Sequence, residues 1–173
     1  MVKWPNRNVR PTYKLEELMK AIFINPPLPD PPYVWLLSIG PVKVGIKEKN
    51  GWYMLFNEET ICLDAEYKFM PLLPLLENRP EEFKDFLEKI LSHSPYQINQ
   101  FPEKLLLEYA FKNSFSEYWP KKALEWLKKN KEIQPLFADE LKKIFKNKVF
   151  SQKTRQQARA IMSTASGGYN KAC

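Results

Sequence analysis

The chain has 173 residues, of which 44 % are hydrophobic and 14 % aromatic, so it can bury a substantial core and is neither disordered nor fibrous. Its net charge of +7 lies at the ends: residues 141–173 hold eight Lys or Arg and no Asp or Glu, and residues 1–20 add a net three positive charges. Residues 21–140 are slightly acidic, with fourteen basic against eighteen acidic side chains. This asymmetry either attracts an acidic protein or a nucleic acid, or only keeps one end of the molecule soluble.

Signals for secretion and for membrane insertion are absent from the sequence. The N-terminal residues 1–14 lack the apolar segment of a signal peptide, and the most apolar runs, 33–39 and 69–76, are too short to cross a bilayer. Two cysteines, Cys62 and Cys173, provide no disulfide framework. We therefore expect a reduced, cytoplasmic protein that makes no membrane contact.

The first elements predicted are a helix and a spacer. Thr12 is a suitable N-cap, and the apolar residues that follow it recur at helical spacing as far as Phe23. Asn25–Pro26 ends this helix. The segment 25–33 has five prolines in nine residues, so we expect an extended, stiff linker.

A small antiparallel sheet is predicted next. The runs 33–39, 42–47, 52–57 and 60–64 are short and rich in β-branched and aromatic residues. Turn signals separate them, the clearest being Asn50–Gly51, a dipeptide typical of hairpins. The mixed alternation favours a sheet with one face packed on helices.

The rest of the chain is predicted to be helical. Pro71 and Pro74 are expected to break the first apolar stretch into a bend or short turn. Pro80 then begins an amphipathic helix, and four more are expected near 102–112, 117–130, 135–147 and 151–163. The sequence thus predicts an α+β fold, with residues 1–76 forming the N-terminal helix, linker and sheet and residues 77–173 a helical region, packed as one unit.

The helical region contains an internal repeat. Residues 107–113 match 141–147 at an offset of 34 positions, and after one inserted residue 115–127 match 150–162. The matched pairs are Leu107/Leu141, Phe111/Phe145, Lys112/Lys146, Asn113/Asn147, Phe115/Phe150, Ser116/Ser151, Ala123/Ala158, Trp126/Ile161 and Leu127/Met162. Recurrence at this period resembles the α-hairpin repeats of HEAT, armadillo and tetratricopeptide proteins over residues 102–163, although the tetratricopeptide Trp-Leu-Gly-Tyr pattern is absent. The competing interpretation is chance agreement between two amphipathic hairpins.

Catalytic chemistry finds little support in the sequence. His93 is the one histidine, which removes multi-histidine metal sites and leaves few possible triads. A site at the sheet around Cys62, Asp64 and His93 is the enzyme hypothesis, but Cys62 alternates with apolar neighbours, as a buried inert thiol does. We expect no cofactor, no metal and, in the favoured interpretation, no enzyme.

The basic C-terminal end supplies the candidate site residues, for which we expect a role in partner binding: Lys142, Lys146, Lys148, Lys153, Arg155 and Arg159. Three interpretations remain open: a solvated cap of a helical array, a surface for an acidic protein, and a surface for nucleic acid. Our favoured hypothesis is a non-enzymatic protein-binding module, such as an adaptor, accessory protein or inhibitor resembling an immunity protein, acting through its helical half. A nucleic-acid-associated protein is the alternative, and a small enzyme the second alternative.

Overall fold

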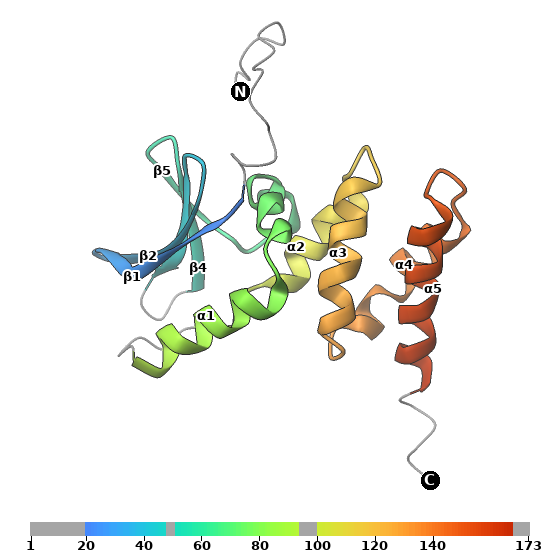
Figure 1. Cartoon of the computed structure of the whole chain (residues 1–173). Helices are drawn as coiled ribbons and strands as arrows, with labels where there is room; N and C mark the ends of the chain where they lie inside the picture. Colours follow the sequence, from blue (N-terminus) through green and yellow to red (C-terminus); the bar gives the residue numbers. More distant parts are fainter. Residues whose placement is uncertain (1–19, 48–50, 94–99, 168–173) are drawn as a thin grey trace, which may run out of the picture.

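A computed structural model of the chain describes residues 20–47, 51–93 and 100–167 (Figure 1). An antiparallel sheet comes first, and helices make up the remainder. The α+β prediction is therefore confirmed. Figure 1 shows the sheet at one end of the molecule and the last two helices at the other.

The sheet has five strands in the order β1–β2–β3–β4–β5. Their bounds are β1 (Ile22–Asp30), β2 (Tyr33–Ile39), β3 (Val42–Lys47), β4 (Gly51–Phe56) and β5 (Glu59–Cys62). Strands β2 to β5 are the four that the sequence predicts, and Asn50 of the predicted hairpin turn lies outside the described residues. The register aligns Val34, Ile46 and Trp52 on the face that packs against the helices, and all three are buried.

Strand β1 occupies the place of the predicted helix end and linker. Ile22 and Phe23 pair with β2 instead of ending a helix, and the remainder of that predicted helix lies outside the described residues, except for Lys20 and Ala21, which are not helical. The proline-rich segment is extended, as predicted, but it is not a linker, because Leu28, Pro29 and Asp30 pair with β2. Proline lacks the N–H that a central strand must donate, but an edge strand pairs on one side only, so it tolerates proline.

The other face of the sheet carries one buried aromatic side chain, Trp35. Its Nε1 donates a hydrogen bond to Asp30 at 2.9 Å, and its ring stacks on Tyr33 with centroids 5.3 Å apart. Gly45 lies opposite it on β3, where an added Cβ would come within 2.0 Å of the Val34 carbonyl oxygen. Glycine is therefore needed at this position for steric reasons.

The 3₁₀ helix η1 (Glu66–Glu77) packs against β2, α2 and α3. It contains Pro71 and Pro74, which cannot donate the backbone hydrogen bonds of an α-helix. Three residues per turn place Phe69, Leu72 and Leu75 on one line, and all three are fully buried. The prediction that the prolines prevent an α-helix is confirmed, but the segment is a long 3₁₀ helix and not a short turn.

Asn78, which follows η1, connects three parts of the fold. Its side chain accepts a hydrogen bond from the Ala21 N–H at 3.2 Å and donates one to the Ala21 carbonyl at 3.0 Å. Its own carbonyl accepts a bond from Trp126 Nε1 at 3.0 Å. Asn78 and Trp126 are both buried, so these bonds tie the start of the sheet to the third helix in a region that excludes water.

The remaining helices are α1 (Pro80–His93), α2 (Glu103–Lys112), α3 (Tyr118–Lys129), the short 3₁₀ helix η2 (Gln134–Phe137), α4 (Ala138–Lys146) and α5 (Gln152–Gly167). The five helices predicted for residues 77–173 are confirmed within a few residues of the predicted bounds. One hydrophobic cluster extends from β2 through η1 and α3 to Ile161 on α5.

The helices α2–α3 and α4–α5 form two successive hairpins, whose connections correspond at an offset of 34 residues. Asn113 and Asn147 follow α2 and α4 and donate their N–H groups to the preceding turn, and α3 and α5 begin at Tyr118 and Gln152. No inserted residue is needed. The pairing of Phe115 with Phe150 is therefore wrong, since Phe115 is fully exposed and Phe150 packs on the core.

The two serines of the predicted repeat differ by one position in the structure. Ser151 directly precedes α5, and its Oγ accepts the Thr154 N–H at 3.3 Å, which is the bond of an N-cap. Ser116 lies one residue further from α3, and its Oγ accepts the Tyr118 N–H at 3.4 Å. Each serine thus lies at the opening of the second helix of a hairpin, although their roles are not identical.

Glu117, the residue before α3, connects the two hairpins. Its carboxylate accepts hydrogen bonds from the Ser151 N–H at 2.6 Å and from the Thr154 hydroxyl at 3.3 Å. Figure 1 shows both connections at the same end of the hairpins. The bond from the Ser151 N–H is the main reason why the pKa of Glu117 lies below its ordinary value.

Replacing Asn78 with Ala is expected to lower the free energy of unfolding by about 2–4 kcal/mol, because buried polar groups of Ala21 lose their partners. Urea denaturation measures this change. Asn113→Ala, at an exposed helix end, is the matched control and should cost less than about 0.5 kcal/mol. Equal effects of the two substitutions would contradict the role of Asn78.

The Glu117 carboxylate is expected to stabilise the fold in a pH-dependent way. Because its pKa is lowered in the native state, its contribution is present above the ordinary glutamate pKa and disappears as the pH falls through the lowered value. Glu117→Gln should therefore be less stable than the wild type at pH 7, and the difference should shrink in acid. Unfolding curves at several pH values test this, with the exposed Glu125→Gln on α3 as control; a difference that does not vary with pH counts against it.

Candidate functional site

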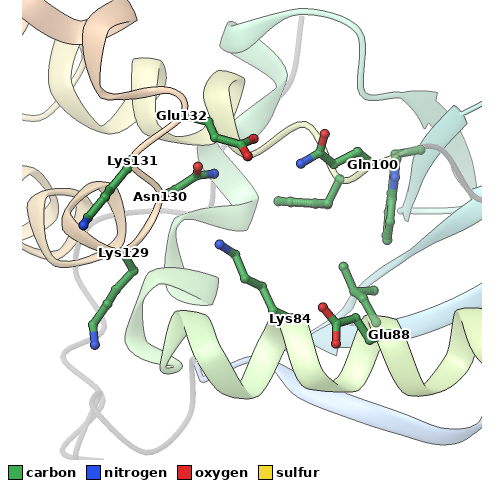
Figure 2. Close-up of a pocket in the computed structure, with 10 residues that line it drawn as sticks. Lys84, Glu88, Gln100, Lys129, Asn130, Lys131 and Glu132 are labelled. Atoms are coloured by element: carbon green, nitrogen blue, oxygen red, sulfur yellow. The ribbon is translucent and has the colours of Figure 1, made fainter. Parts of the chain in front are cut away.

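A pocket of about 520 Å³ opens between the sheet, α1 and the segment after α3 (Figure 2). Its apolar floor consists of Trp52, Leu87 and Phe101, and the Trp52 and Phe101 rings meet edge to face with centroids 5.0 Å apart. Polar side chains surround this floor: Lys84, Glu88, Gln100, Lys129, Asn130, Lys131 and Glu132. The volume falls in the usual range for small-molecule pockets.

The charges around this pocket do not select a ligand of one sign. Lys129 pairs with Glu81 at 2.5 Å, and Figure 2 shows Lys129 and Lys131 extending away from the pocket. Lys84 points into the pocket, where the two glutamates of the rim offset its charge. Neither a simple anion nor a simple cation is favoured by this arrangement.

A largely buried carboxyl group lies behind the pocket. Glu103, at the start of α2, accepts a hydrogen bond from Asn130 Nδ2 at 3.1 Å through one oxygen, while its other oxygen is buried without a hydrogen-bond partner. Burial raises the pKa of Glu103, and the bond from Asn130 and the nearby Lys84 oppose this shift in part. The carboxylate therefore holds Asn130 in place at an energetic cost to the charged form.

A second cavity of about 280 Å³ lies between the end of α3 and α5 and shares Lys131 with the first. Gln134 is one of the residues that line this second cavity. The Gln134 amide donates to the Leu127 carbonyl at 3.0 Å, which also accepts the Asn130 N–H at 3.2 Å, and accepts from the Thr164 hydroxyl at 3.3 Å. Gln134 is buried, so its role in the structure is to connect α3 with α5.

The six basic residues predicted as a binding site lie on α4, on α5 and in their connection. Lys142, Lys146, Lys148, Lys153 and Arg159 are exposed, and Arg155 is half-buried. None of the six takes part in an ion pair within the described ranges. Their charge is therefore not neutralised inside the fold.

Arg155 and Arg159 lie on one side of α5, whereas Lys153 lies on another side of this helix. Arg159 on α5 lies over the ring of Phe145 on α4, with its guanidinium carbon 5.7 Å from the ring centre. Arg155 precedes Arg159 by one helical turn and shares its side of α5, whereas Lys153 is about 200° around the helix from Arg155. We name the group Lys142, Lys146, Arg155 and Arg159 the cationic flank.

Of the alternative enzyme site at the sheet, the structure describes the side chains of Cys62 and Asp64. Cys62 pairs with Tyr53, on the face opposite to Trp52 and α1, and α1 is the helix that ends at His93. The side chain of His93 lies outside the described residues. Asp64 forms an ion pair with Lys68 at 2.5 Å.

The described residues contain neither a metal-binding cluster nor a helix that could span a membrane. No group of three or more His, Cys, Asp or Glu side chains gathers there as a metal ion would require. None of the helices in these parts of the chain combines the length and apolar character needed to cross a membrane.

Sequence reasoning missed both cavities. Their linings come from β4, α1, the segments 100–101 and 128–134, and α5. Because these segments are far apart in the sequence, no local sequence pattern predicts the cavities. The one available signal was the polar run 128–132, which interrupts the helical periodicity at the end of α3.

Glu103→Gln is expected to raise the free energy of unfolding at pH 7, because it removes a charge that burial disfavours and keeps an oxygen for Asn130. A raised native pKa means that the wild type loses stability as the pH rises from the ordinary glutamate pKa through the native value. The increase in the free energy of unfolding caused by Glu103→Gln should therefore become smaller as the pH falls. Thermal unfolding across pH measures it, with the exposed Glu132→Gln as control. A loss of stability at neutral pH would contradict this account.

Comparisons with known proteins identify no relative. No protein-family model, curated protein or solved structure matches the chain. The resemblance to α-hairpin repeats therefore stays a prediction from sequence, and the function rests on the surface chemistry of this molecule.

Proposed function

We propose that the protein is a non-enzymatic, cytoplasmic protein-binding module that captures an acidic partner through its helical half. The observation that supports this is the excess of basic side chains from Leu141 in α4 through α5. Residues 141–167 contain seven Lys or Arg and no acidic residue, and the six predicted ones form no ion pair in the described structure.

The arrangement of these charges favours a partner over a plain solvated surface. Lys142/Lys146 and Arg155/Arg159 are like-charged pairs four residues apart, and such pairs each destabilise a helix by about 0.2–0.5 kcal/mol. Elsewhere in the fold, several helical lysines lie near a carboxylate, as Lys104 does with Glu108 at 3.8 Å. An acidic surface placed on the flank relieves this repulsion and accelerates association.

An exposed apolar side chain next to these charges also suits a protein partner. Val149, in the connection between α4 and α5, is 87 % exposed and follows Lys148 directly. Protein interfaces combine apolar contacts with a polar and charged rim. A nucleic acid backbone has no comparable use for an isolated aliphatic side chain.

Removing the flank charges tests the proposal. The triple variant Lys142→Gln, Lys146→Gln and Arg159→Gln should bind fluorescent poly-L-glutamate at least about fivefold more weakly than the wild type, as followed by anisotropy at fixed salt. A matched variant, Lys20→Gln, Lys104→Gln and Lys128→Gln, removes the same charge from exposed positions elsewhere and should bind nearly as the wild type does.

Two outcomes would overturn the proposal. Equal weakening in both variants would show that net charge alone attracts the polyanion. A flank-dependent affinity for duplex or single-stranded DNA, with none for poly-L-glutamate at the same ionic strength, would favour the alternative of a nucleic-acid-associated protein.

A further inference from the structure

We propose that Arg159, held over the ring of Phe145, is the anchor of this interface and binds a side-chain carboxylate of the acidic partner through the edge of its guanidinium group. This inference rests on the proposed function and names the group that recognises the partner. It also predicts that the site distinguishes arginine from lysine, which charge alone does not do.

The contact with the Phe145 ring restrains the Arg159 side chain. The guanidinium carbon of Arg159 lies 5.7 Å from the centre of the Phe145 ring, within the range of a cation–π contact. Phe145 on α4 is half-buried, whereas Arg159 on α5 is exposed. The guanidinium thus lies over an aromatic ring while the side chain, with its N–H donors, stays exposed to solvent.

Such a stack prepares an arginine for carboxylate binding. An unrestrained arginine loses up to about 2 kcal/mol of side-chain conformational entropy when it is immobilised at an interface. The aromatic contact restricts the side chain before binding, so less entropy remains to be lost. A planar carboxylate then fits the planar edge through two parallel hydrogen bonds, which an ammonium group cannot reproduce.

Because the residues around Arg159 in the sequence supply no carboxylate, the partner has to supply the one that Arg159 binds. Residues 141–167 contain no Asp or Glu, and no ion pair of the described structure includes Arg159. Arg155, one turn earlier on the same side of α5, has a buried Nε without a hydrogen-bond partner. An acidic group at Arg159 therefore also reduces the repulsion between the two arginines.

The small size of the cationic flank favours a protein segment over a long polyanion as the partner. The flank occupies two helices, α4 of nine residues and α5 of sixteen, and extends about one turn along each. The exposed Val149 lies in the connection between these helices. An acidic segment with one or two carboxylates and an adjacent apolar residue matches this surface.

The test keeps the net charge constant. Arg159→Lys preserves the charge but removes the planar group, and Phe145→Leu preserves an apolar side chain but removes the π face. Each should weaken binding of poly-L-glutamate by about three- to tenfold at fixed salt, as measured by calorimetry. Arg79→Lys is the matched control, because Arg79 is an exposed arginine outside the flank and lies 3.9 Å from Glu82. This variant should bind poly-L-glutamate as the wild type does.

Spectroscopy gives a second readout in the folded protein. The Nε–Hε signal of Arg159 in NMR spectra should shift on addition of poly-L-glutamate, and that of Arg79 should not. Urea unfolding of each variant confirms that Arg159→Lys is folded, and Arg159→Lys remains informative if Phe145→Leu is unstable.

The outcomes separate this inference from the function on which it rests. If Arg159→Lys binds poly-L-glutamate as the wild type does while the triple charge variant does not, the anchor is wrong and the binding module stands. If the triple variant also binds normally, both fail. If Arg159→Lys weakens binding of inorganic polyphosphate but not of poly-L-glutamate, Arg159 is a phosphate site and the inference is overturned.

Discussion

One buried amide joins the two halves of this fold. Asn78 uses both atoms of its side-chain amide on the backbone of Ala21, where the sheet begins, and its carbonyl accepts the indole N–H of Trp126. An unpaired polar group in such a place destabilises a fold strongly, so the geometry of these three bonds restricts how the sheet and the helices meet. The position of α3, and with it the hairpins beyond, depends on this contact.

The helix η1 provides the apolar counterpart of that constraint. Pro71 and Pro74 exclude an α-helix, and the 3₁₀ geometry that results aligns Phe69, Leu72 and Leu75 as a fully buried ridge. Sheet and helices pack on this ridge from different sides. Beyond α3, Gln134 and Glu117 fix the second hairpin by hydrogen bonds at its two ends, so the cationic flank is presented by a well-supported element.

Local patterns predicted most of the elements and few of the connections between them. Alternation gave β2 to β5, and helical spacing gave α1 to α5, because these signals depend on neighbouring residues. The edge strand β1 was missed, since proline argues against pairing unless the position of the strand in the sheet is known. The repeat was found, but identity at Phe115 and Phe150 shifted its register by one residue relative to the helix starts. The exposed basic residues were predicted, whereas their separation around α5, the Arg159–Phe145 contact and both cavities depend on packing.

The prolines of β1 have a consequence for the behaviour of the protein at high concentration. A sheet that ends in an exposed strand offers a row of unpaired backbone groups to other molecules, which is a common route to aggregation. Here residues 26, 27 and 29 of that strand have no N–H to offer, and the strand leaves the ladder between Phe23 and Leu28. A second copy of the chain therefore cannot pair along the full length of β1, and this prevents intermolecular extension of the sheet at this edge.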